Sequence, residues 1–96
     1  MKAIIEIINQ LSILEEKTGQ SEEYTRPFSR IRQALSDMGY SYSVPVNEAY
    51  KDTRTDLEAT IIGENADNLV ITKVIKPVIV KDAQIVQRAV VIVEPQ

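Results

Sequence analysis

Histidine and cysteine are both absent from this chain of 96 residues, and only three of its residues are glycine. Without histidine or cysteine the chain cannot build a zinc site of the usual kind, a disulfide, a thiol nucleophile or a histidine acid–base catalyst. The glycines stand alone at positions 19, 39 and 63, so the sequence also contains no glycine-rich phosphate loop. These absences predict a protein that is not an enzyme and that binds neither a metal nor a cofactor.

The chain carries a small excess of acidic residues, with 14 Asp plus Glu against 11 Lys plus Arg and a formal net charge of −3. Nucleic-acid binders normally show a basic patch, and proteins held on anionic membranes show a basic cluster, so neither partner is expected. No apolar run approaches the ~18 residues that span a bilayer. Glu6 interrupts the apolar start where a signal peptide would continue. We therefore expect a soluble, cytoplasmic protein.

Carboxylates are the only acid–base groups present in number. Pairs such as Asp56 with Glu58 and Glu22 with Glu23 could serve as a general acid and base. They lie in polar stretches, however, and no stretch has the oxygen-ligand spacing of a calcium loop. The interpretation that we favour is that they are solvated surface groups.

Residues 1–39 place apolar side chains at helical intervals, in steps of three, four and three residues. Gly19 is predicted to end the first helix and Gly39 the second, while Thr25 is a plausible N-cap with Pro27 in the turn after it. The sequence thus predicts a helical hairpin. The two predicted apolar faces consist of Ile4, Ile7, Leu11 and Leu14 in the first helix and Phe28, Ile31, Leu35 and Met38 in the second.

The first helix has more apolar surface than one short partner helix can cover, because Ile5, Ile8 and Ile13 widen its apolar face. Isolated helices of this length are also marginal in water. Two hairpins packed as a four-helix bundle would cover the excess, so we predict a homodimer whose interface is formed by the two apolar faces. The alternative is that the second half of the same chain folds over the excess.

Residues 40–96 are rich in β-branched side chains, and isoleucine and valine fill 15 of the 36 positions from 61 to 96. Proline and turn residues divide this part into four to six short strands. We expect strands at 40–44, 57–62, 69–76, 78–80 and 84–93. The last one is apolar on both faces, so it should lie inside a sheet. The predicted fold class is α+β, with a dimerising helical hairpin over 1–39 and a small all-β domain for partner binding over 40–96.

The order of these elements, together with three local motifs, resembles the GrpE family of nucleotide exchange factors. Residues 31–40 are similar to the family's bundle helix where it runs into leu-x-x-phe-gly-val, and Pro45, Asn47 and Tyr50 parallel its pro-x-gly-x-x-phe segment. Residues 74–93 align without insertion with the closing motif, val-leu-x-x-gly-tyr, three variable residues, and asp-arg-val-leu-arg-pro-ala-x-val-x-val. The positions that keep the apolar or small character of that motif are Val74, Ile75, Ile85, Val86, Ala89, Val91 and Val93.

The resemblance implies that the chain promotes ADP release from a DnaK-type chaperone by binding its ATPase domain, mainly through the β domain. The partner-contact set that it implies is Asn47, Val78, Ile79, Lys81, Gln84 and Gln87. Five of these positions differ from the family pattern, which has glycine at 47, gly-tyr at 78–79 and arginine at 84 and 87. The first predicted helix is also much shorter than the family's stalk. The alternative function is that of a dimeric adaptor with the same fold that binds a different protein.

Overall fold

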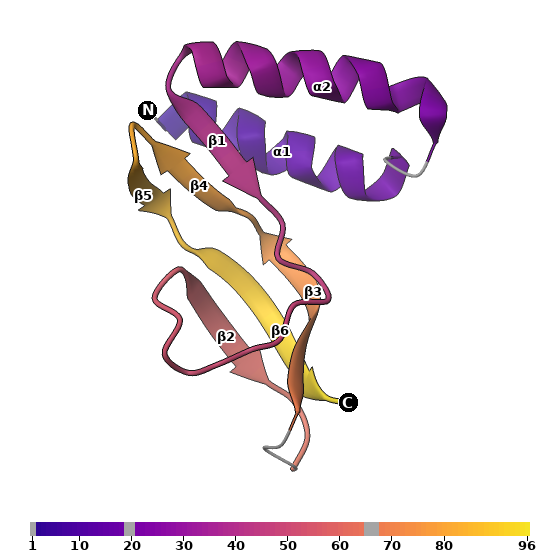
Figure 1. Ribbon diagram of the computed structural model, residues 1–96, viewed down its shortest axis with the longest axis vertical. Helices are drawn as coiled ribbons and strands as arrows, with labels where there is room; N and C mark the ends of the chain where they lie inside the picture. Colours follow the sequence, from indigo (N-terminus) through magenta and orange to yellow (C-terminus); the bar gives the residue numbers. More distant parts are fainter. Residues whose placement is uncertain (1, 19–20, 65–67) are drawn as a thin grey trace.

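Two helices lie side by side at one end of the molecule in the computed structural model, which describes residues 2–18, 21–64 and 68–96 (Figure 1). Helix α1 spans Lys2–Thr18 and helix α2 spans Glu22–Asp37. The predicted helical hairpin is therefore confirmed. The backbone of Gly39 has a φ of 85° immediately after α2, which is the left-handed stop expected there. Gly19, the predicted stop of the first helix, lies outside the described residues.

Helix α2 begins three residues before the predicted N-cap. Ser21 is the N-cap residue, and Glu22 and Glu23 occupy the first turn, where carboxylates suit the positive end of the helix dipole. Pro27 consequently falls inside the helix and cannot donate a hydrogen bond to the carbonyl of Glu23. Glu23 is exposed, so water can satisfy that carbonyl, and the helix continues through the proline. Thr25 is a helical residue here and not a cap.

In the part of the chain that the structure describes, six strands form two three-stranded sheets. Strands β1, β4 and β5 (Tyr40–Ser43, Val78–Lys81 and Gln84–Gln87) form one sheet in the order β1-β4-β5. Strands β2, β3 and β6 (Leu57–Ile61, Leu69–Lys76 and Ala89–Pro95) form the other in the order β2-β6-β3. The α+β class and the central position of the last strand are thus confirmed. The single strand expected over 84–93 is instead broken at Arg88, because its two halves pair in different sheets.

The β1-β4-β5 sheet lies between the helices and the other sheet, and β4 is its middle strand. Ile79 packs toward the helices with Tyr40 and Tyr42, whereas Val78 and Val80 pack toward the β2-β6-β3 sheet. This period-two alternation is that of a strand buried on both faces. The helix cluster consists of the buried residues Ile8, Leu35, Tyr40, Tyr42 and Ile79. The sheet cluster consists of the buried residues Leu57, Ile71, Val78, Ala89, Val91 and Val93.

The chain's own sheet covers most of the apolar surface that suggested a dimer. Ile8 is completely buried, and Ile4, Leu11 and Ile31 pack against the helix cluster. Phe28 and Leu35 are also buried within the single chain. Among the predicted interface residues, Phe28 and Leu35 are therefore not available to a second chain, while Ile4, Leu11 and Ile31 are partly buried by their own chain. The four-helix bundle stays a prediction.

Three of the eight predicted interface residues are largely accessible in the single chain. Ile7, Leu14 and Met38 are each about half exposed. Ile7 and Leu14 lie two helical turns apart on the outer side of α1. Any pairing of two chains through the helices has this narrower apolar surface to use.

Candidate protein-binding surface

The residues expected to contact a partner do not form one surface. Val78 and Ile79 are 6 % and 0 % exposed, because they fill the sheet cluster and the helix cluster from opposite faces of β4. Their assignment to a partner-contact surface was wrong. Asn47 and Gln84 are exposed, but Asn47 lies in the segment that leads from β1 to β2 and Gln84 begins β5.

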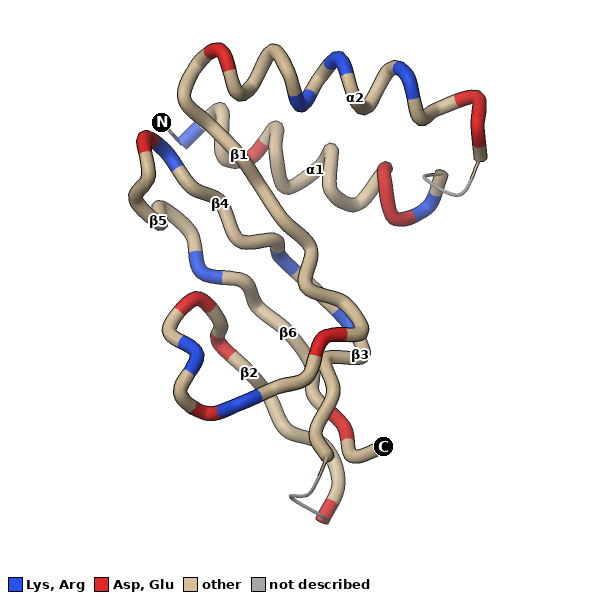
Figure 2. The backbone as a smooth tube through the Cα atoms, viewed as in Figure 1, with Lys and Arg blue, Asp and Glu red and all other residues tan. Residues whose placement is uncertain are grey.

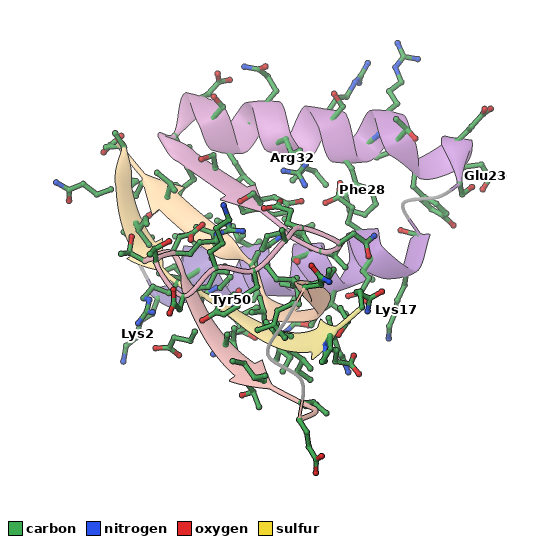
Figure 3. The ribbon with its side chains drawn as sticks, turned by 60° about the horizontal axis from the view of Figure 1, so that its bottom comes forward. Lys2, Lys17, Glu23, Phe28, Arg32 and Tyr50 are labelled. Carbon is green, nitrogen blue, oxygen red and sulfur yellow. The ribbon has the colours of Figure 1, made fainter. Side chains whose placement is uncertain are left out.

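Asn47 helps to attach its segment to the free side of β3. It has a φ of 68°, and its backbone N–H donates to the carbonyl of Ile71 at 2.8 Å. The backbone N–H of Tyr50 donates to the carbonyl of Leu69 at 2.9 Å, and the Tyr50 side chain packs on the sheet cluster. Figure 3 shows Tyr50 over the sheets. The segment thus closes one edge of the β2-β6-β3 sheet.

Lys81 fastens the β4–β5 hairpin to the end of α2. Its Nζ donates to the carbonyl of Met38 at 3.0 Å and to Asp82 Oδ2 at 2.9 Å, and it lies 5.1 Å from the centre of the Tyr40 ring. Asp82 and Ala83 both have positive φ, as the two-residue turn of a tight hairpin requires. Lys81 therefore has a role within the chain.

Gln87 links β5 to α1 through a reciprocal pair of amide hydrogen bonds. Its Nε2 donates to Asn9 Oδ1 at 2.8 Å, and Asn9 Nδ2 donates back to Gln87 Oε1 at 3.1 Å. The same Nε2 donates to the carbonyl of Pro77 at 2.9 Å. Since the carbonyl and the amino group of the Gln87 side chain are both engaged, a partner would have to displace these contacts in order to use them.

A second polar contact joins both helices to β1. The Arg32 guanidinium donates to Glu15 Oε1 at 2.7 Å and to the carbonyl of Tyr42 at 2.9 Å, and it stacks on the Tyr42 ring at 3.9 Å. The Tyr42 hydroxyl donates to the same Glu15 oxygen at 2.9 Å. Burial and this hydrogen bond raise the pKa of Tyr42 to about 12. Figure 3 shows Arg32 and Phe28 pointing from α2 toward the rest of the chain.

A shallow groove of about 370 Å³ lies where the two sheets meet. It is lined by Glu58, Lys76, Ile85, Val86, Gln87, Arg88 and Val90. Ile85 is about half exposed, so the groove has an accessible apolar side chain. The Arg88 guanidinium donates to the carbonyls of Thr55 and Leu57 and approaches Glu58 to 3.5 Å. Of the predicted contact residues only Gln87 borders this groove, and the sequence offered no spacing that would have joined the others.

The carboxylate pairs considered for catalysis have structural partners or lie at a helix start. Asp56 accepts two hydrogen bonds from Arg54, which lowers the pKa of the Asp56 carboxyl from its usual value. Glu58 lies beside Arg88, and Glu22 and Glu23 are exposed in the first turn of α2. Within residues 2–18, 21–64 and 68–96, no three Asp or Glu side chains gather as they would around a metal ion.

Neither described helix is long and apolar enough to cross a membrane.

Comparisons of the chain with protein-family models, with curated proteins and with solved structures found no significant match.

Proposed function

We propose that this chain is a cytoplasmic protein-binding module that acts as a nucleotide exchange factor of the GrpE type on a DnaK-type chaperone. The observation that supports this most is how the segment resembling the closing motif is divided between core and surface. Ala89, Val91 and Val93 are completely buried, whereas Ile75 and Ile85 are about half exposed. One segment thus supplies both the core of the β region and accessible apolar side chains for a partner.

The proposed activity needs no catalytic side chain. An exchange factor has only to bind the ATPase domain more tightly when its nucleotide cleft is open. The coupling between two ligands is reciprocal. The bound factor therefore weakens the binding of ADP to the ATPase domain by the same ratio as bound ADP weakens the binding of the factor. A β region with two sheets braced against a helical hairpin would be a suitably rigid body for this purpose.

Release of a fluorescent ADP analogue from the ATPase domain tests the proposal directly. We expect the chain to accelerate release in proportion to its concentration until the complex saturates. Gln84→Arg restores the charge found at that position in the family and should strengthen binding, since charge-assisted hydrogen bonds are stronger than neutral ones. Gln33→Arg makes the same change on exposed α2 and serves as the control. Unchanged ADP release at saturating factor would rule the activity out.

We also propose that two copies associate through the outer side of the helices. The half-exposed side chains of Ile7 and Leu14 support this, because both lie on α1 away from the buried helix cluster. Sedimentation equilibrium should give twice the monomer mass, and Ile7→Lys with Leu14→Lys should restore the 10.8 kDa monomer without unfolding it. Ala34→Lys on exposed α2 is the control. A monomer at every accessible concentration would contradict the association.

A second candidate function is an adaptor that binds a different protein. It is favoured by the burial of Val78 and Ile79 and the hydrogen bonds of Gln87 within the chain, because the resemblance implied partner contacts at these three positions. An adaptor would leave the rate of ADP release unchanged and would still capture its own partner. The exchange assay therefore separates the two candidates.

A further inference from the structure

Among the described residues, the β2-β6-β3 sheet contributes side chains of only one face to a buried cluster. Ala89, Val91 and Val93 of β6 belong to the sheet cluster, whereas Val90 and Ile92 alternate with them and belong to neither buried cluster. The segment between β1 and β2 crosses the buried face, where Tyr50 packs (Figure 1). The opposite face, which we call the open face, consists of Glu58, Thr60, Val70, Lys73, Lys76, Val90, Ile92 and Glu94.

Strand register decides which side chains share the open face. Directly paired residues point to the same side of a sheet, and Lys73 pairs with Ile92 while Lys76 pairs with Val90. The two lysines are three residues apart, so in a regular strand they would point to opposite faces. A register shift between Val74 and Lys76 brings them to the same one.

The open face therefore has an apolar column bordered by a basic one. Val90 and Ile92 are partly exposed along β6, and Lys73 and Lys76 are exposed along the neighbouring strand. In the ion pairs formed between described residues, neither lysine takes part. Figure 2 shows these basic positions on β3.

The groove between the sheets extends this face. Glu58, Lys76 and Val90 belong to both, and the groove adds the half-exposed Ile85 and the Arg88 guanidinium. The open face also has two carboxylates, of which Glu58 pairs with Arg88, while Glu94 accepts a hydrogen bond from the Thr72 hydroxyl and keeps its charge. Two lysines that form no ion pair among the described residues, beside an apolar column, are suited to carboxylates on an acidic, partly apolar partner.

We propose that the open face and the adjoining groove dock an acidic, partly apolar surface of the partner protein. Val90, Ile92 and Ile85 would cover apolar side chains of the partner, and Lys73 and Lys76 would pair with its carboxylates. The proposal rests on the proposed function only in taking the ATPase domain of a DnaK-type chaperone as that partner.

The test compares two double variants of equal net charge. Lys73→Glu with Lys76→Glu reverses the open face, and Lys17→Glu with Lys51→Glu makes the same change at exposed positions on α1 and the β1–β2 segment. Binding of the ATPase domain is measured by fluorescence anisotropy at low and high salt. The open-face variant should bind at least about tenfold more weakly at low salt, with a smaller salt dependence, and the control within about twofold of the wild type. Circular dichroism checks that both variants fold.

The outcomes separate this inference from the proposed function. If wild type binds and both variants bind equally well, the open face is not the docking surface, although the proposed function stands. If wild type does not bind the ATPase domain, the proposed function fails. The face is then tested with a synthetic peptide of alternating glutamate and valine, followed by amide chemical shifts. Shifts confined to β3, β5 and β6 that disappear in the open-face variant support the inference. Shifts elsewhere, no shifts, or self-association lost in that variant would overturn it.

Discussion

The helix cluster and the sheet cluster are held together by different kinds of interaction. The sheet cluster is built from aliphatic side chains alone, and backbone ladders fix the strands around it. The helix cluster contains two tyrosines, and the contacts of Glu15 with Arg32 and of Asn9 with Gln87 border it. Side-chain polar contacts therefore help to hold the helices on the sheet, whereas backbone ladders hold the strands of each sheet together.

The reason lies in what each element can use to fix its position. A strand gains its register from the backbone hydrogen bonds of its neighbours. The backbone hydrogen bonds of a helix form within the helix itself, so only its side chains can set its orientation on a sheet. Apolar burial is non-directional, whereas hydrogen bonds between named atoms accept one geometry. Helix α1 thus depends on side chains for its place in a way that β6 does not.

The largest effects are expected from removing one isoleucine from each cluster. Ile8 and Ile71 are both completely buried, so Ile8→Ala and Ile71→Ala should each lower the free energy of unfolding by about 2–5 kcal/mol. Chemical denaturation followed by circular dichroism measures this. Hydrogen exchange should show Ile71→Ala loosening all six strands, and Ile8→Ala mainly the helices with β1. Uniform loosening by both variants would mean that the two clusters behave as one.

High pH should weaken the helix cluster through Tyr42. The folded state raises the pKa of Tyr42 to about 12 from an ordinary 10.0, so the folded protein favours the protonated phenol. The contribution of this protonated phenol to the free energy of unfolding is complete below pH 10 and is lost as the pH rises toward 12. The free energy of unfolding should fall by roughly 2 kcal/mol over that range. Denaturation on either side of pH 10 measures the loss. Tyr42→Phe should lack it, whereas Tyr24→Phe, at an exposed tyrosine, should retain it.

Gly39→Ala should destabilise the junction of α2 with β1 by about 1–2 kcal/mol. The φ of 85° is strained for alanine, and the new methyl group would meet the Asp82 carboxylate. That carboxylate is largely exposed and can swing away, so backbone strain should account for most of the loss. In an Asp82→Gly background the loss of stability caused by Gly39→Ala should be only slightly smaller. If that loss disappears in this background, the clash with Asp82 and not backbone strain is its cause.

The smallest effect concerns the amide pair between α1 and β5. Asn9→Ala and Gln87→Ala should each lower the free energy of unfolding by about 1 kcal/mol. The double variant should lower it by less than the sum of the two. Thermal unfolding of the four proteins gives the coupling. Gln10→Ala removes an exposed amide on the same helix and should change little. Strict additivity would show that the amide pair contributes nothing to the attachment of α1.

Local patterns in the sequence were enough to locate most elements. Helical spacing found both helices, and strand 69–76 was predicted with the bounds that β3 has. The apolar character of both faces placed β6 inside a sheet. Two errors lie at element ends and have different causes. The start of α2 was placed too late although the hydrogen bonds of Ser21 are all local, whereas the effect of Arg88 depends on residues distant in sequence. Arg88 lies between β5 and β6, where the chain passes from one sheet to the other. Its guanidinium donates hydrogen bonds to the carbonyls of Thr55 and Leu57.

The site was less accessible to sequence reasoning than the fold. Val78 and Ile79 were chosen as contacts by their place in a motif, and both are buried because β4 is covered on both faces. No spacing along the chain indicates that Gln87 would meet Asn9, which lies 78 residues earlier. The groove was missed for the same reason, since its residues come from β2, β3, β5 and β6.

By itself, the sequence determined the kinds of element, their order and the absence of histidine and cysteine chemistry, because composition and periodicity are properties of the chain alone. Tertiary structure decided which apolar residues face another element. The β1-β4-β5 sheet covers the inner side of α1, whereas Ile7 and Leu14 on the outer side stay accessible. It also decided that Lys73 and Lys76 share a face. An extra residue between paired positions reverses the direction of every later side chain, and only pairing with β6 places that residue.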